Sequence, residues 1–279
     1  MLKRRVKAVL SRTWWAYDGA ALIDALRTMG VAAADTVMVH SSWREHNGFS
    51  GKPADVAGAL RQLVGEDGLL VMPSMPYHNM STAQFLARGK PLDVRRTPSM
   101  MGMVSESFRR SDGVVRSLSP THPLVAWGRD SHAFVAGHEL TDEPFGRESP
   151  FARLLQRDAW LLGLDAPFAS FTFTHHVEVL TSQALPFPLY EPEALPATVI
   201  DPTGRRIECR VRVISEHAHR ARREERLVAE LHRRGSWRQR RVGNTDLLLI
   251  RAQDVLQAAS GLVVSGQHFF EIGPLPGRD

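Results

Sequence analysis

Short apolar runs alternate with segments of helical periodicity along the chain. Residues 35–40, 69–72 and 161–163 are apolar runs bounded by polar or glycine residues, a pattern typical of buried strands. The apolar positions of residues 53–64 recur at the spacing of one helix face, and residues 18–30 show the same spacing. This alternation of strands and helices predicts an α/β fold, with a central mixed sheet flanked by helices.

The second half of the chain predicts a hairpin, a charged helix, and a final strand and helix. Residues 197–200 and 206–213 can pair around the turn D-P-T-G. Residues 215–234 predict a single charged helix, residues 245–250 a strand and residues 252–259 a helix. These elements continue the α/β pattern of the first half.

One region, residues 74–100, lacks clear periodicity. A segment of this length without regular structure is typical of a functional or lid-like region. No repeat and no low-complexity linker divides the chain. We therefore expect a single domain, residues 1–279, that begins with a basic extension, residues 1–17.

The composition argues against several classes of protein. With 43% hydrophobic and 23% charged residues, the 279-residue chain is typical of globular proteins. Its one cysteine, Cys209, leaves no internal disulfide and no cysteine cluster for zinc, and fits a reducing compartment. The sequence also lacks a run of 18 apolar residues. We expect a cytoplasmic protein without a membrane partner.

The net charge of +5 is unevenly distributed. Residues 1–12 carry +5, and residues 217–241 carry nine arginines against three glutamates, a net +6. Subtracting both from the total leaves −6 for the rest of the chain. Basic segments can bind nucleic acid, but they are more often solvated helix faces. The prediction is no nucleic-acid partner, and binding through residues 217–241 stays open as an alternative.

The strongest candidate for chemistry follows the strand at residues 161–163. A helix that begins near Thr174 places His175 and Glu178 three positions apart on one face. A carboxylate in that position can hold the imidazole in one tautomer and support its protonated form. His175, His176 and Glu178 could also hold a metal in an amidase or deacetylase. We expect no metal, because adjacent histidines on a helix point about 100° apart.

A second candidate is the polar segment that ends the first strand. His40, Ser41 and Ser42 stand before a glycine-containing loop and a helix. Hydroxyls and exposed backbone N–H groups converge in such a turn, and Arg44 adds a positive charge. The segment is suited to binding a phosphate or a carbonyl group, although ordinary strand-to-helix turns share this composition.

Six segments follow one another in order along the chain. They are D-T-V-M-V-H-S-S at 35–42, L-L-V-M-P at 69–73, D-V-R-R-T-P-S-M-M-G at 93–102, Arg116 and Ser117 with His122, Phe145 and Gly146 with Ser149 and Pro150, and L-L-G at 161–163 with T-F-T-H-H-V-E at 172–178. In this order they resemble the aminoglycoside 3-N-acetyltransferase family. The resemblance covers about residues 20–260.

The resemblance implies an acetyl-CoA-dependent N-acetyltransferase with a single α/β unit unrelated to the GNAT fold. The family's histidine base corresponds to His175, its motif acid to Glu178, and a residue near the thioester to Thr172. The residues that we assign to the coenzyme on this basis are His40, Ser41, Ser42, Arg44, Ser117 and Ser149. Acetyl-CoA is expected as cosubstrate, with no metal.

The implied chemistry agrees with the residue types. An amine attacks a thioester only in its neutral form, and an imidazole can take the proton during the attack. Thr172 or a nearby N–H is the candidate donor to the oxyanion. The acceptor is a small-molecule amine, either an aminoglycoside or, because residues 40–150 lack a dense carboxylate cluster, a biosynthetic amine. We expect a monomer or a homodimer.

Overall fold

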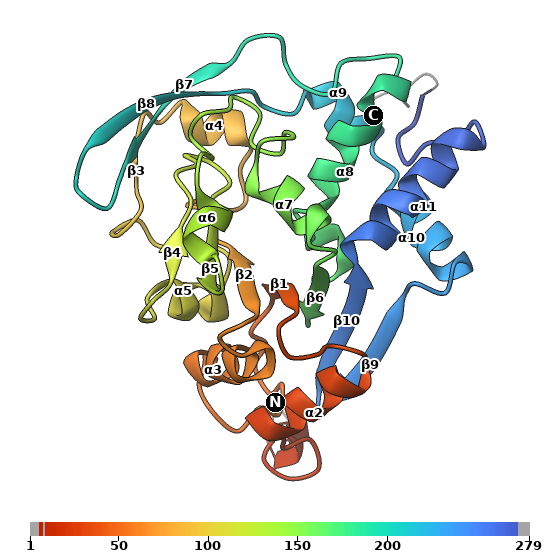
Figure 1. Ribbon diagram of the computed structural model, residues 1–279. Helices are drawn as coiled ribbons and strands as arrows, with labels where there is room; N and C mark the ends of the chain where they lie inside the picture. The colour runs from red at the N-terminus through yellow and green to blue at the C-terminus, as the bar shows by residue number, and fades with distance from the viewer. Residues whose placement is uncertain (1–5, 8, 273–279) are drawn as a thin grey trace.

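The computed structural model describes residues 6, 7 and 9–272, so part of the expected basic extension, residues 1–17, lies outside the described residues. A seven-stranded sheet forms its centre, in the order β4-β5-β2-β1-β6-β10-β9 (Figure 1). The strands are β1 (Thr36–Ser41), β2 (Leu69–Pro73), β4 (Val115–Arg116), β5 (Leu124–Gly128), β6 (Trp160–Leu164), β9 (Arg238–Val242) and β10 (Thr245–Arg251).

Parallel and antiparallel pairing are combined in this sheet. The middle strand β1 runs parallel to β2 and to β6, with His40 opposite Gly163. The outer strands are antiparallel, since β5 pairs with β2, and β10 pairs with β6 and β9. The predicted α/β fold with a mixed sheet is confirmed.

Helices cover both faces of the sheet, because successive strand side chains point to opposite faces. Val37 and Val39 of β1 pack into one core with α2, α3 and α5, while Met38 packs into the other core with the remaining helices named here. The first group is α2 (Gly19–Thr28), α3 (Pro53–Val64) and α5 (Met103–Arg109). The second is α6 (Ser131–Val135), α7 (Pro150–Gln156), α8 (Thr174–Thr181), α9 (Glu216–Ala221), α10 (Glu224–Arg233) and α11 (Ala252–Val264).

A small second sheet lies beside the first. It consists of β3 (Leu92–Asp93), β7 (Leu195–Ile200) and β8 (Arg206–Val211), and the last two form the predicted hairpin. The Asp201 carboxylate accepts hydrogen bonds from the N–H groups of Thr203 and Arg205, which fixes the turn. In Figure 1 the hairpin runs along one side of the molecule near α4 (Thr82–Leu86). This short helix begins within the segment that lacks periodicity in the sequence.

The prediction of one charged helix over residues 215–234 was wrong, because two helices occupy this region. Helix α9 ends at Ala221, and Arg222 has an extended ψ of 131°. Residues 269–271 form hydrogen bonds with the break between α9 and α10. The Arg223 N–H donates to the Phe269 carbonyl (2.7 Å), and the Glu271 N–H donates to the Ala221 carbonyl (2.6 Å). Tertiary pairing therefore overrides the helical periodicity.

The basic segment 217–241 is not one solvated face. Several of its arginines pair with carboxylates of the same chain, including Arg234 with Glu230 (2.7 Å) and Arg241 with Asp246 (2.6 Å). Its last residues form β9, an edge strand absent from the sequence prediction because arginines occupy its positions.

Within the described part of the chain, no helix combines the length and apolar character needed to cross a bilayer.

Candidate active site

The carboxyl ends of the three parallel strands β1, β2 and β6 meet at one edge of the sheet. This edge is where open α/β sheets commonly bind ligands. The loop after β1 and the loop after β6 lie side by side there, since the Ser42 N–H donates to the Leu164 carbonyl at 2.9 Å. The sequence-predicted residues of both loops are therefore neighbours.

Gly163 allows the loop after β6 to fold back over its own strand. A Cβ atom at this position would lie 2.6 Å from the Ala166 carbonyl oxygen and 3.1 Å from the Phe171 ring. The Phe171 ring instead stacks on His40 of β1, with 4.8 Å between ring centroids. Helix α8 begins three residues later, at Thr174, whose hydroxyl donates to the Phe171 carbonyl.

His175 and Glu178 lie together on α8, as their spacing predicts. The distance from His175 Nδ1 to Glu178 Oε2 is 2.9 Å. Arg222 approaches the same carboxylate, with its Nη2 at 2.9 Å from Oε2 and its Nε at 2.7 Å from Oε1. A histidine, a carboxylate and a guanidinium thus form one polar cluster at this edge of the sheet.

The charge of Glu178 fixes the direction of the hydrogen bond in this cluster. Glu178 is fully buried, and burial alone would raise its pKa, but His175 and Arg222 lower the pKa below its ordinary value. An ionised carboxylate can only accept hydrogen bonds, so His175 Nδ1 carries the proton. The Nε2 atom then holds the lone pair, and the imidazole side chain is 19% exposed.

Sequence reasoning missed Arg222, which comes from the break between α9 and α10. Its Nη2 also lies 3.0 Å from His175 Nδ1, so the guanidinium touches both members of the pair. A run of arginines in a predicted surface helix gives no reason to select this one. What distinguishes Arg222 is its place in the break between the two helices, which the hydrogen bonds to residues 269–271 hold in position.

The Phe145 ring packs against the ring of His175, the candidate base. Its ring centroid lies 4.6 Å from that of His175 and 4.6 Å from that of His122. The neighbouring His176 donates from Nδ1 to the Phe145 carbonyl at 2.8 Å, so it points away from Glu178. Among the residues that the structure describes, no group of three or more His, Cys, Asp or Glu side chains is arranged to hold a metal ion.

Thr172 lies directly against His40. The Thr172 N–H donates to His40 Nε2 (3.1 Å), and the Thr172 hydroxyl lies 3.2 Å from the same nitrogen. Burial lowers the pKa of His40 to about 3, so this imidazole is neutral near pH 7. Because the backbone N–H occupies the lone pair of Nε2, the hydroxyl is the Thr172 donor that a ligand can use.

His40 is one of six coenzyme candidates, and the other five fall into two groups. Ser41, Ser42 and Arg44 stand at the end of β1, and Arg44 forms an ion pair with Asp165 (2.9 Å) while its side chain stays 54% exposed. The structure does not bring Ser117 or Ser149 to this surface. Both are fully buried; the Ser117 hydroxyl donates to His138 Nδ1 (2.9 Å), and that of Ser149 donates to the Gly146 carbonyl (2.6 Å).

An acidic cavity of about 810 Å³ borders this site. Three glutamates line it, with no lysine or arginine among the lining residues: Glu191, Glu193 and Glu216. Thr82 and His219 line it as well, and Tyr77 links Thr82 (2.8 Å) to His122 (3.2 Å), which packs on Phe145 beside His175. Sequence reasoning missed this cluster because two of the glutamates lie within the proline-rich connector 186–196 and the third begins a distant helix.

Comparison with known proteins agrees with this geometry. The family model described as aminoglycoside 3-N-acetyltransferase matches residues 38–263. Aminoglycoside N(3)-acetyltransferase VII of Streptomyces paromomycinus is 31% identical over 191 residues, 64% of each chain. Aminoglycoside N(3)-acetyltransferase III of Pseudomonas aeruginosa is 30% identical over 58% of this chain and 63% of its own length. The chain therefore matches less than two thirds of the length of these curated relatives.

Solved structures extend the likeness over nearly the whole chain. The crystal structure of aminoglycoside acetyltransferase AAC(3)-Xa superposes with a TM-score of 0.76 and 25% identity, over 92% of this chain and 95% of its own. AAC-IIIb, in its binary complex with CoASH, shares the fold with a TM-score of 0.73 at 22% identity, over 93% of this chain and 99% of its own. The family match covers far more than half of the sequence, and the chain belongs to the aminoglycoside 3-N-acetyltransferase family.

Proposed function

We propose that this protein transfers an acetyl group from acetyl-CoA to an amine of a polycationic small molecule, such as an aminoglycoside. The observation that carries the proposal is the His175–Glu178 pair at the carboxyl edge of the sheet. His175 Nδ1 lies 2.9 Å from Glu178 Oε2, and the imidazole is partly exposed. Membership of the family and the adjoining acidic cavity support it. We further propose that the protein acts in the cytoplasm, as a monomer or a homodimer.

His175 acts as the general base in this mechanism. The acceptor nitrogen attacks the thioester carbonyl carbon while Nε2 of His175 takes the amine proton. Glu178 stabilises the imidazolium that forms, and the Thr172 hydroxyl donates to the oxyanion of the tetrahedral intermediate. When the carbon–sulfur bond breaks, the imidazolium returns a proton to the departing CoA thiolate, and the neutral imidazole is restored.

The transfer is direct, without a cysteine intermediate. Cys209 lies on β8 in the second sheet, and burial raises the pKa of its thiol to about 11. A thiol of that pKa is almost entirely protonated near neutrality and is a weak nucleophile. The attacking group is therefore the acceptor amine itself.

The coenzyme binds along the end of β1 in this proposal. Ser41 and Ser42 offer hydroxyls to the pantetheine or the phosphates, and exposed Arg44 adds a positive charge nearby. The relative AAC-IIIb was solved with CoASH, which supports a coenzyme site in this fold. For Ser117 and Ser149 we propose an indirect part, because their buried hydroxyls hold the elements behind the site.

Acetyl-CoA is expected to raise the melting temperature of the protein. At a hundred times its Kd, a ligand that binds only the folded state adds about 2.7 kcal/mol to the free energy of unfolding. Thermal unfolding at increasing acetyl-CoA concentration measures this shift. The shift at a fixed concentration should be smaller in Ser42→Ala and unchanged in the control Ser50→Ala, which alters an exposed serine. Absence of any shift at saturating coenzyme would contradict the assigned site.

The acidic cavity favours a cationic acceptor. Three carboxylates without a basic residue in the lining attract a molecule that carries several ammonium groups. The named relatives are aminoglycoside acetyltransferases, and AAC(3)-IVa was solved with a gentamicin and with apramycin. An aminoglycoside therefore fits both the cavity and the family better than an uncharged biosynthetic amine.

Removing two carboxylates from this cavity is expected to weaken acceptor binding. In the double variant Glu191→Gln and Glu193→Gln, KM for a polycationic acceptor should rise about thirtyfold, since each of the two charges contributes about 1 kcal/mol at close range in water and about 1.4 kcal/mol corresponds to a factor of ten. The KM for acetyl-CoA should stay constant. Steady-state kinetics with thiol detection measures both, and added salt should raise the acceptor KM less in the variant than in the parent.

The control for this experiment is Glu66→Gln, which removes an exposed glutamate after α3 that does not line the cavity. An equal rise in KM for the control would show that net charge alone attracts the acceptor. An unchanged acceptor KM in the double variant would place the acceptor elsewhere.

A further inference from the structure

A second cavity, of about 790 Å³, lies at the β4 edge of the large sheet. Its walls come from β4, the end of α5, α6 and the chain that follows β3, and valine, leucine and proline side chains contribute much of them. Four arginines also line it: Arg95, Arg109, Arg110 and Arg116. The lining includes none of the residues assigned above to the coenzyme or to the acceptor.

Arg116 is buried without a carboxylate partner. It is 8% exposed, and its guanidinium donates to the carbonyl oxygens of Thr97 (2.6 Å) and Ser74. Its Nε atom is buried and has no hydrogen-bond partner, and no ion pair joins Arg116 to an acid among the residues described. Burial, together with the charge of Arg109, lowers the pKa of Arg116 to about 9.

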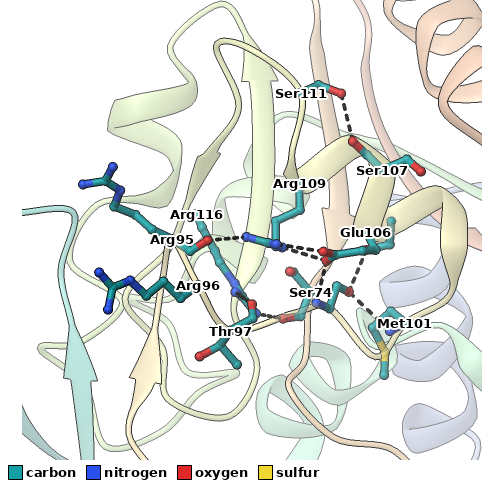
Figure 2. A network of polar contacts seen from close by, with 12 residues as sticks. Ser74, Arg95, Arg96, Thr97, Met101, Glu106, Ser107, Arg109, Ser111 and Arg116 are labelled. Atoms are coloured by element: carbon teal, nitrogen blue, oxygen red, sulfur yellow. Dashed lines mark hydrogen bonds and ion pairs between the residues drawn. The ribbon is translucent and has the colours of Figure 1, made fainter.

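The acidic groups nearest to this arginine have other partners. Figure 2 shows Arg109 turned toward Glu106, which it contacts at 2.7 and 2.8 Å. The Asp93 carboxylate accepts from the backbone N–H groups of Arg95 and Arg96 at 2.9 and 3.0 Å. One acid, Glu139, lies in the cavity wall against the four arginines. The lining therefore has a net positive charge.

The other two arginines of the lining, Arg95 and Arg110, are exposed. Arg95 approaches the Pro202 carbonyl at 3.4 Å, and Arg110 directly follows the last residue of α5. Neither forms an ion pair in the part of the chain that the structure describes. A buried guanidinium without a counter-ion costs several kcal/mol in folding, and a bound anion would offset that cost.

We propose that this cavity binds an organic anion, with an oxyanion head such as a phosphate or carboxylate held by Arg95, Arg110 and Arg116. The planar guanidinium groups suit a two-point contact with such a head. The valine-rich walls accommodate an aromatic or aliphatic body, and the volume falls within the range of small-molecule sites. The site is separate from the acetyl-transfer site and does not depend on the function proposed above.

The test is calorimetric titration of the full chain with phenyl phosphate, in the presence and absence of saturating CoA. Binding is expected with a Kd below about 1 mM. Affinity should fall as salt is added, and benzyl alcohol, which lacks the anion, should bind at least tenfold more weakly. Benzoate and inorganic phosphate separate the contributions of the head and the body. The Kd should be the same with and without CoA.

Arg110→Gln is expected to weaken phenyl phosphate binding about tenfold, because it removes a charge-assisted contact from an exposed position and leaves the fold intact. Arg27→Gln, at an exposed position of α2, is the matched control and should leave the Kd unchanged. The proposal is overturned if phenyl phosphate gives no heat of binding, if both variants lose affinity equally, or if benzyl alcohol binds as well. Competition by CoA would also overturn it, by assigning the cavity to the coenzyme.

Discussion

Replacement of His175 by alanine is expected to lower kcat by about a hundredfold to ten-thousandfold, the usual contribution of a positioned general base. In the proposed mechanism Nε2 takes the proton from the attacking amine, and the other ring nitrogen is held 2.9 Å from Glu178. Release of CoA thiol measures the loss. The variant should still bind acetyl-CoA, so the thermal shift with coenzyme should be preserved.

A matched control for this variant is His217→Ala, which removes an exposed imidazole from α9. Activity retained in His175→Ala would contradict the assignment and would direct attention to His219. That residue lines the acidic cavity, and burial lowers its pKa, followed by the charges of Arg222 and His175. It is neutral near pH 7, so a base at this position would reveal itself in the His219→Ala variant.

The sequence predicts the sheet and the His175–Glu178 pair because both depend on local pattern. The apolar runs at β1, β2 and β6 are buried on both faces, so each reads as a strand without reference to the rest of the chain. His175 and Glu178 share one helix, and a spacing of three residues is enough to place them together. Helix α3 has the bounds that its periodicity predicts.

Residues that meet through tertiary pairing are beyond this kind of reasoning. Arg222 reaches Glu178 only because the chain near Phe269 pairs with the break between α9 and α10. The glutamates of the acidic cavity gather because the connector before β7 packs near α4 and α9, which no local pattern encodes. Ser117 and Ser149 show the converse, since family motifs mark them but the fold buries their hydroxyls.

Replacement of Arg222 by methionine is expected to lower the free energy of unfolding by about 3 kcal/mol at pH 7. The substitution leaves the carboxylate of Glu178 fully buried beside a single partner, His175, and breaking a buried ion pair is costly for this reason. We expect a loss at the lower end of the usual range for a buried ion pair, because the Arg222 side chain is 22% exposed and solvent weakens its attraction to Glu178. Urea unfolding followed by circular dichroism measures the change.

The double variant Arg222→Met with Glu178→Gln should recover much of this loss, because it removes the unpaired charge together with its partner. Arg241→Met is the matched control: it breaks an ion pair of similar length (2.6 Å) between two exposed side chains, and should cost less than about 1 kcal/mol. Equal losses of unfolding free energy in Arg222→Met and Arg241→Met would mean that the burial of Glu178 does not determine the size of the loss.

The pH dependence of the same variant follows from the lowered pKa of Glu178. A carboxyl whose pKa is lower in the folded than in the unfolded state stabilises the fold above its ordinary pKa of 4.5, and this contribution is lost as the pH falls through the folded-state value. Without Arg222, the pKa of Glu178 is higher than in the parent, because only His175 then opposes the effect of burial, and protonation relieves the variant as the pH falls. The difference in unfolding free energy between parent and Arg222→Met should therefore be largest near neutrality and should shrink in acid. A difference that stays constant down to about pH 3, below the ordinary carboxyl pKa, would show that Arg222 stabilises the fold through packing and not through the charge of Glu178.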